Sequence, residues 1–391
     1  DPKTGIGTAG FFSKSHNSHR SEIQFAVIGS KQHIQDTIDF IGRLSERIEA
    51  TGKVIALEDA VEIEDGIIMD LFDAEANAEQ EQVTVELNKK FNPDFPGLSK
   101  TGMIGCEFQN DSANNIAIKS KDVEAVLKEK VTLLEKVDRI IEWYVEAYQD
   151  MYENFTARPD VCFMILPDKV FNKLGSIQRG KSFVNLRRKL KAAVMALPQS
   201  DIPVQIALEG TVRGTNKKMQ DLSMVAWNFV VAQYYKTANC IPWALTDVDK
   251  NSCFIGISFH KLQEAENSTM RSSIAQAFNR EGKGLVFTGK QFDWNSAKTK
   301  VTAPHLQYDY AKGLIQHVLR GYVKINKHTP SRIVLHKTTD FWDTAINPDY
   351  AEVEGLTDGI REVLGDAVEI DFVTIKSAPV KLLRLGGDYP V

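Results

Sequence analysis

Apolar and polar positions along this chain follow two repeating patterns. Short runs of consecutive apolar residues are typical of buried strands, and apolar residues at three- and four-residue steps are typical of amphipathic helices. A strand is predicted over Ile23–Gly29. The helix predicted after it has Ile34, Ile38, Ile41, Leu44 and Ile48 on its apolar face. A much longer helix is predicted over Ser120–Tyr152, whereas the residues before Ile23 predict coil.

Strands and helices alternate between residues 160 and 240. Apolar runs at Asp160–Pro167 and Ile202–Leu208 predict buried strands, and helices are predicted over Lys169–Leu174, Phe183–Leu197 and Met219–Lys236. Such alternation implies a parallel sheet with right-handed crossovers. Ligands of such sheets generally bind at the carboxyl ends of the strands.

The last part of the chain has a different order of elements. Three consecutive strands are predicted first, over Cys253–Lys261, Ser272–Asn279 and Gly284–Gly289. A helix, a strand, a helix and a strand are predicted next, over Tyr308–Val323, Arg332–His336, Leu356–Leu364 and Val368–Ile375. An antiparallel meander followed by this alternation is the order of an RNase H-like fold.

These patterns divide the 391 residues into three regions of an α/β protein. We expect an α/β N-terminal region with the long helix over 1–155, a Rossmann-like domain over 156–240 and an RNase H-like domain over 241–391. A chain of this length is too long for one ordinary domain. It begins at Asp1 without a methionine, so we expect the sequence to be part of a longer gene product.

Composition narrows the class of protein. With 43% hydrophobic and 25% charged residues the chain is typical of soluble globular proteins, and no apolar run approaches the roughly 20 residues that span a bilayer. The four cysteines, Cys106, Cys162, Cys240 and Cys253, are far apart in sequence, which favours reduced thiols over disulfides or zinc. We therefore expect a cytoplasmic protein with no membrane association.

Charge is unevenly distributed. Eleven acids and no Lys or Arg lie between residues 54 and 88, and either a solvated acidic face or a partner-binding surface accounts for them. Eight Lys or Arg and no acids lie between Lys169 and Ser200, although the formal net charge is −5. A local cationic region in an acidic protein indicates a specific anionic ligand.

The cationic region supplies candidate ligands for a phosphate. Arg187 and Lys191 are four residues apart and share a helix face, Gln205 lies on the following strand, and Lys236 ends the next helix. Converging cations and amide donors are what a terminal phosphate requires. The alternative, about equally consistent with composition, is a basic helix that faces solvent.

Aromatic residues at the end of the long helix admit two interpretations as well. Trp143, Tyr144 and Tyr148 form either a stacking platform for bases or part of the core, and core packing is the more frequent explanation.

Several segments in order resemble one protein family. ALPQSDIPVQI, AWNFVVAQYYKTANCIPWAL, CFIGISFHK and SRIVLHKTTDFW resemble the MID and PIWI domains of prokaryotic Argonautes, over about 220 residues. The N-terminal GIGTAGFF, AVIG and PDFPG segments are similar to those of short Argonautes in particular. After the final LLRLGGDYPV a PIWI domain normally continues, so the resemblance implies that its C-terminal part is missing here.

The resemblance implies a binding pocket for the 5′-phosphate of a guide strand. Arg187, Lys191, Gln205 and Lys236 match the family's phosphate-binding positions, with Arg187 in place of the more usual His or Tyr. This replacement puts base stacking by that residue in question, although a guanidinium can also stack. Arg188 and Lys189 are expected on the outer face of the helix. A Mg²⁺ ion that bridges the guide phosphate is common in the family.

The resemblance also addresses catalysis. The family's first two catalytic Asp positions fall on Ser258 and Lys337, and neither residue can ligate the two metal ions of RNase H-like cleavage. We therefore expect a catalytically inactive Argonaute. The alternatives are a guide-directed endonuclease with an atypical acid set, for which Asp340 and Asp343 are the nearest acids, and an α/β protein that binds a small phosphate compound.

Partners follow from the short-Argonaute resemblance. It implies a guide RNA, a single-stranded DNA target and a heterodimer with an APAZ-containing effector protein. That effector would carry a TIR, sirtuin-like or nuclease domain, with NADase or nuclease activity. The implied role is defence against plasmids and phages, in which target recognition activates the effector.

Overall fold

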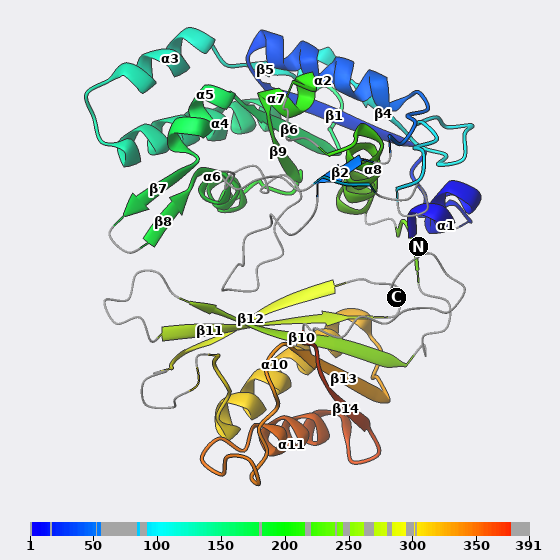
Figure 1. Ribbon diagram of the computed structural model, residues 1–391, viewed down its shortest axis with the longest axis vertical. Coiled ribbons are helices and arrows are strands. Elements are labelled where there is room, and N and C mark those ends of the chain that lie inside the picture. Colours follow the sequence, from blue (N-terminus) through cyan, green and yellow to red (C-terminus); the bar gives the residue numbers. More distant parts are fainter. Residues whose placement is uncertain are drawn as a thin grey trace. The chain divides into compact units, whose positions relative to one another are not determined.

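The computed structural model divides the chain into two compact units, with the boundary between Trp243 and Ala244. The structure describes residues 2–15, 18–51, 53–55, 84–86, 92–179, 182–215, 220–238, 241–244, 251–261, 270–279, 284–294, 301 and 303–376. Each unit has its own sheet and its own core (Figure 1).

A parallel sheet forms the centre of the first unit. Its strands, in spatial order, are β4 (Glu107–Asn110), β1 (Glu22–Gly29), β6 (Val161–Leu166) and β9 (Val204–Leu208). A two-residue strand, β5 (Ile116–Ala117), also pairs with β1. All these pairings are parallel, and the alternating pattern between residues 160 and 240 predicts this for β6 and β9. The boundary expected at residue 155 lies inside this sheet, because β1 pairs with β6 across it.

Helices cover both faces of this sheet (Figure 1). One face packs against α2 (Lys31–Leu44), α7 (Glu209–Arg213) and α8 (Leu222–Ala238). The other packs against α3 (Ser120–Lys128), α4 (Leu133–Asn154), α5 (Asp168–Leu174) and α6 (Leu186–Met195). Successive residues of β6 belong to the two cores in turn, since side chains alternate along a strand.

Helix capping explains two departures from the predicted elements. The predicted helix over 120–152 is two helices, because Thr132 and Glu135 form a capping box that starts α4 anew. The predicted helix from Phe183 begins instead as β8 (Ser182–Asn185), paired with β7 (Ser176–Arg179). Asn185 then caps α6 by accepting a hydrogen bond from the Arg188 backbone N–H at 3.0 Å.

The N-terminal residues, predicted as coil, form α1 (Pro2–Ala9) and the 3₁₀ turn η1 (Phe12–Ser15). Burial of Ile6 and Phe11 in the core that includes α8 stabilises this segment despite its glycines. The backbone N–H groups of Phe12 and Ser13 donate to the carbonyls of Pro242 and Ile241, at 2.9 and 3.0 Å. The chain's beginning is thus fixed to the segment that follows α8.

The aromatic residues of α4 pack in the core. Tyr144 and Tyr148 are buried, and their hydroxyls donate to the carbonyls of Ile165 and Ile202 at 2.5 and 3.0 Å. The core interpretation is therefore confirmed for these two residues.

Only β2 (Lys53–Ile55) and β3 (Thr84–Glu86) of the acidic segment are described, as an antiparallel pair. The choice between an acidic face and a partner surface otherwise lies outside the described residues. Cys106, Cys162 and Cys253 are buried free thiols, and Cys240 is also outside the described part. Within that part, no helix is long and apolar enough to cross a membrane.

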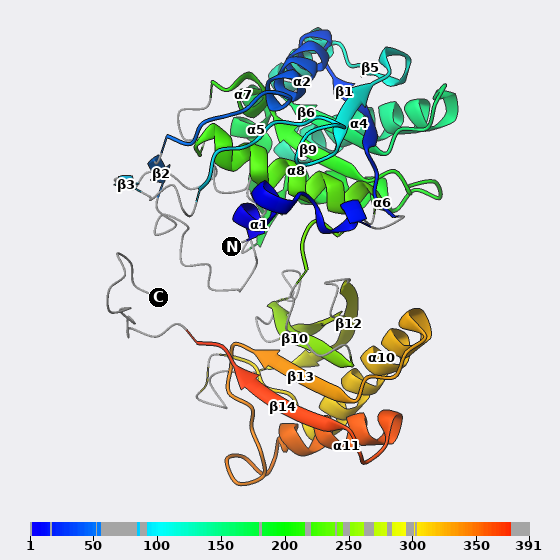
Figure 2. The ribbon, with the colours of Figure 1, turned by 90° about the vertical axis from the view of Figure 1, so that its right-hand side faces the viewer.

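The second unit contains a mixed five-stranded sheet with two helices on one face (Figure 2). Its strands, in spatial order, are β12 (Gly284–Asp293), β11 (Met270–Phe278), β10 (Ser252–Lys261), β13 (Arg332–Lys337) and β14 (Glu369–Thr374). The pairings among β10, β11 and β12 are antiparallel, and β13 is parallel to both neighbours.

The helices of the second unit are α10 (Tyr308–Asn326) and α11 (Glu352–Leu364). The backbone of α11 approaches α10 closely at Gly359, where an added Cβ would lie 2.8 Å from the carbonyl oxygen of Lys312. The order of elements is the predicted RNase H-like order. Together the two units confirm the predicted α/β fold.

Candidate nucleic-acid interface

Arg187 lies at the start of α6, on the second residue of the helix. Its side chain is only 5% exposed, and its guanidinium lies over the ring of Phe171 at 4.5 Å. Burial of an arginine is uncommon, because a charged group loses hydration unless other groups compensate. Burial of Arg187 therefore argues against the alternative in which this residue faces solvent.

The other cations of α6 differ in exposure. Lys191 is half-buried one turn after Arg187 and shares its face of the helix. Arg188 is exposed, as expected for the outer face. Lys189 is half-buried and forms an ion pair with Asp138 of α4.

Gln205 and Lys236 are in direct contact. The buried Oε1 of Gln205 on β9 accepts a hydrogen bond from Lys236 Nζ, near the end of α8, at 2.9 Å. The same oxygen accepts a second hydrogen bond, from Gln233 Nε2 at 3.1 Å. Sequence reasoning missed Gln233, although its place one turn before Lys236 on the same helix was a usable signal.

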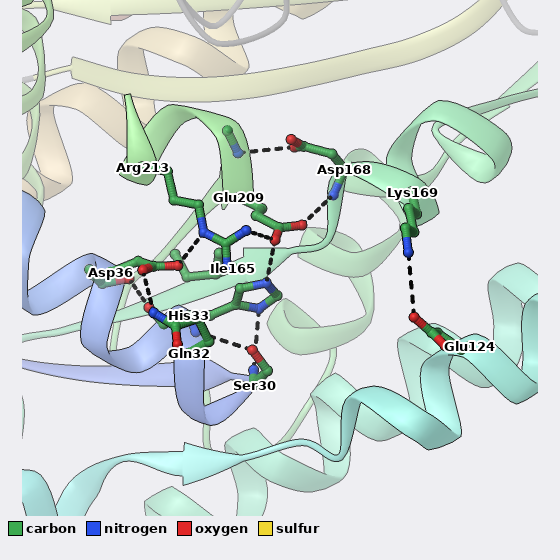
Figure 3. Close-up of polar contacts among 12 residues, drawn as sticks. Ser30, Gln32, His33, Asp36, Glu124, Ile165, Asp168, Lys169, Glu209 and Arg213 are labelled. Atoms are coloured by element: carbon green, nitrogen blue, oxygen red, sulfur yellow. Dashed lines mark hydrogen bonds and ion pairs between the residues drawn. The ribbon is translucent and has the colours of Figure 1, made fainter. Parts of the chain in front are cut away.

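This contact lies away from the edge where parallel sheets usually bind ligands. Gln205 is the second of five residues in β9, so it lies near the amino end of the strand. The carboxyl edge of the sheet is instead occupied by side chains that bind one another (Figure 3). Glu209, directly after β9, lies 3.7 Å from His33 Nε2 and also contacts Arg213.

The other polar groups around Glu209 are also hydrogen-bonded to one another or to the backbone. Arg213 Nε donates to Asp36 at 2.6 Å, and the backbone N–H of Asp168 donates to Glu209 at 3.2 Å. His33 Nδ1 accepts from the backbone N–H of Ser30 at 3.2 Å and closes the capping box of α2. Each of these groups has a partner, so the network serves to hold α2, α5 and α7 at the ends of three strands.

Burial lowers the pKa of His33 below its ordinary 6.5, and Glu209 only partly opposes this effect. The unfolded chain therefore binds a proton more readily than the folded chain, and stability should fall as pH falls below about 6.5. We expect His33→Gln to weaken this decline, because Gln also closes a capping box but does not titrate. The measurement is the melting temperature of both proteins between pH 7.5 and 5. An equal fall in melting temperature for the wild-type protein and His33→Gln would contradict the prediction.

The second unit places Ser258 and Lys337 on opposite faces of its sheet. Ile257, not Ser258, is the residue paired with Lys337, and side chains alternate along a strand. Ser258 is exposed, whereas Lys337 points into the core side. The structure therefore does not bring these two positions together.

Lys337 forms a buried ion pair. Its Nζ donates to both carboxylate oxygens of Glu352, at 2.7 and 2.6 Å, and both side chains are 0% exposed. Burial lowers the pKa of the Lys337 amine, and Glu352 opposes this effect. The ring of His305 lies 3.6 Å from the same carboxylate and stacks on Trp342 at 3.6 Å.

The nearest acids to Lys337 are also engaged. Asp340 forms an exposed ion pair with Lys376 at 2.7 Å, and this pairing lowers the pKa of its carboxyl group. Asp343 accepts a hydrogen bond from the backbone N–H of Ile346 at 2.8 Å. Asp340 therefore binds a lysine that follows β14, and Asp343 binds the backbone of its own loop.

The residues of the first unit fit a bound metal ion poorly. In the described part of the chain no cluster of three or more His, Cys, Asp or Glu could hold one. The Oε1 of Gln205, an oxygen that could ligate a cation, is already bound by the ammonium group of Lys236. The Mg²⁺ ion therefore remains a prediction.

Comparison with known proteins places this fold. No protein-family model and no curated protein matches the sequence. The structure is similar to Clostridium butyricum Argonaute bound to a guide DNA and a 19-mer target DNA, with TM-score 0.50 and 14% identity over 96% of this chain and 37% of that one.

Two further solved structures give lower scores, and no conclusion rests on them. Drosophila Piwi has TM-score 0.46 and 11% identity, over 94% of this chain and 37% of that one. Marinitoga piezophila Argonaute in complex with a 5′ OH guide RNA has TM-score 0.44 and 9% identity, over 92% of this chain and 40% of that one. The chain thus spans well under half the length of these proteins. The fold of this chain is similar to the MID and PIWI fold of the Clostridium butyricum Argonaute.

Proposed function

We propose that this chain binds the 5′-phosphate of a guide strand in its first unit and the guide–target duplex along both units. The observation that carries the proposal is the contact of Gln205 with Lys236 at 2.9 Å in a fold similar to a guide-bound Argonaute. Arg187 and Lys191 of α6 are assigned to the same pocket on the basis of the resemblance alone, because α6 and α8 pack against opposite faces of the sheet. Charge-assisted hydrogen bonds from such groups are the strongest that a phosphate receives from side chains.

Direct binding of oligonucleotides tests this proposal. A fluorescent RNA should bind the purified chain, with its effector partner if one is required for stability, more tightly with a 5′-phosphate than with a 5′-hydroxyl. Equal affinity for the two RNAs would contradict a phosphate pocket. Inorganic phosphate or a mononucleotide that competes as well as the RNA would favour the alternative of a protein that binds small phosphate compounds.

The proposed protein recognises its target without cutting it. Strand β10 contains no acid on either face, and Lys337 on the neighbouring strand β13 binds Glu352 through its ammonium group. We expect no cleavage of a complementary target in the presence of Mg²⁺ or Mn²⁺. Denaturing gel electrophoresis of the labelled target is the measurement, and a product cut opposite the middle of the guide would show an endonuclease with other acids.

The output of such a protein would come from a partner. The short-Argonaute resemblance supports a heterodimer with an APAZ-containing TIR, sirtuin-like or nuclease effector, activated when an RNA guide pairs with a DNA target. The biological role would be defence against plasmids and phages. Isolation of a stable, guide-loaded monomer with no co-purifying protein would count against this arrangement.

A further inference from the structure

We propose that Gln233 is a positioning residue that fixes the side-chain amide of Gln205, so that its Nε2 donates to the bound anion. This inference rests on the proposed phosphate site and adds a residue to it. Gln233 does not contact the anion in this scheme. It acts through Gln205, to whose Oε1 it donates a hydrogen bond at 3.1 Å.

The two ends of the Gln205 amide have opposite chemistry. The oxygen only accepts hydrogen bonds, whereas the nitrogen carries two hydrogens and only donates. An ammonium group only donates, so the contact with Lys236 requires the Gln205 oxygen at that end. Nε2 is then at the other end, where it donates to the carbonyl of Ile206 at 3.1 Å. We assign its second hydrogen to the anion.

Lys236 alone is a poor anchor for this orientation. Its side chain is exposed, near the end of α8, and a lysine ammonium on its flexible four-carbon stem can turn toward an anion when one binds. Gln205 Oε1 would then lose that donor. Gln233 is only 1% exposed, so its side chain has little freedom to move. It would continue to hold the Gln205 oxygen while Lys236 binds the phosphate.

The environment of Gln233 supports a role beyond packing. Its Oε1 is buried and, among the described residues, has no hydrogen-bond partner. An apolar side chain of similar volume would avoid the cost of burying that atom. The next residue, Tyr234, is fixed by its stack on Phe11 at 3.9 Å and by its hydroxyl contact with His19 at 2.7 Å. The helix that carries Gln233 is therefore anchored.

The test compares two substitutions of similar size. Gln233→Met removes the donor, and Gln233→Glu replaces it with an acceptor that favours the reversed amide of Gln205. The quantity measured is the ratio of dissociation constants for the 5′-hydroxyl and 5′-phosphate forms of one RNA. We expect this ratio to fall about threefold or more in Gln233→Met and about tenfold or more in Gln233→Glu, with 5′-hydroxyl affinity unchanged.

A matched control separates orientation from charge. Tyr235→Glu places the same negative charge next to Lys236, on an exposed side chain of the same helix. We expect it to lower the ratio less than Gln233→Glu. An equal loss in the two variants would overturn the orientation argument.

The remaining outcomes distinguish the inference from the site itself. If the wild-type ratio is near one, the phosphate site is absent and both proposals fail. If the wild-type ratio is high and Gln233→Met retains it, the site stands and the role of Gln233 is overturned. Equal loss of affinity for both RNAs in Gln233→Met would show that Gln233 only supports the fold. Thermal unfolding of each variant confirms that the proteins compared are folded.

Discussion

Replacing Glu352 with Ala should destabilise the second unit by about 3–5 kcal/mol, because it leaves the ammonium of Lys337 buried without its carboxylate. Both side chains are 0% exposed, so water cannot replace the lost partner. The backbone N–H of Trp342 also loses an acceptor, since it donates to Glu352 at 3.3 Å. Chemical denaturation that resolves the second unit's transition is the measurement.

A double substitution and an exposed ion pair provide the controls. Lys337→Met combined with Glu352→Leu removes both charges together, and such replacements are often neutral or stabilising. Asp340→Ala breaks the pair with Lys376, in which both side chains are 57% exposed, so its effect should stay below about 1 kcal/mol. If Glu352→Ala were as mild as Asp340→Ala, the buried pair would not be a main support of this unit.

Lys191→Ala should remove most of the preference for a 5′-phosphorylated guide. Loss of one hydrogen bond to a charged group costs about 1.5–3 kcal/mol, which is roughly a 10- to 150-fold weaker affinity. The 5′-hydroxyl form of the same RNA should bind as before. Fluorescence anisotropy with both RNAs measures the change.

Arg188→Ala is the matched control for Lys191→Ala. It removes a positive charge from the same helix, but from an exposed side chain on the outer face. Its effect should be small and equal for both RNAs, because surface charge attracts any phosphate backbone. If the two variants behaved alike, α6 would be a general basic surface and the phosphate pocket would lie elsewhere.

Local patterns in the sequence predict much of this fold. Apolar runs such as Ile202–Leu208 contain the strands, and the order of elements after residue 250 predicts the RNase H-like sheet. Apolar periodicity did not predict where polar capping residues end one element and start the next. Thr132 and Asn185 each start a helix by accepting a backbone hydrogen bond. The spacing of apolar residues stays the same on both sides of such a capping residue, so the spacing does not reveal the new start.

The candidate site shows the same division. The spacing of Arg187 and Lys191 places them on one helix face, and the structure adds the contact of Gln205 with Lys236 that spacing alone cannot show. Gln233 was overlooked because its position among apolar residues of the helix is also that of a core residue, and its partner Gln205 is known only from the structure. The opposite faces of Ser258 and Lys337 depend on strand register, which only the paired sheet reveals.

The central position of β1 has a consequence for studies of the isolated phosphate site. A fragment of residues 156–240 contains Arg187, Lys191, Gln205 and Lys236, but it lacks the strand that pairs with β6. Without β1, the side of β6 opposite β9 would expose unpaired backbone groups, and apolar side chains would also be exposed. Such exposure promotes aggregation. The site is therefore expected to survive only in fragments that begin before residue 22, where β1 starts.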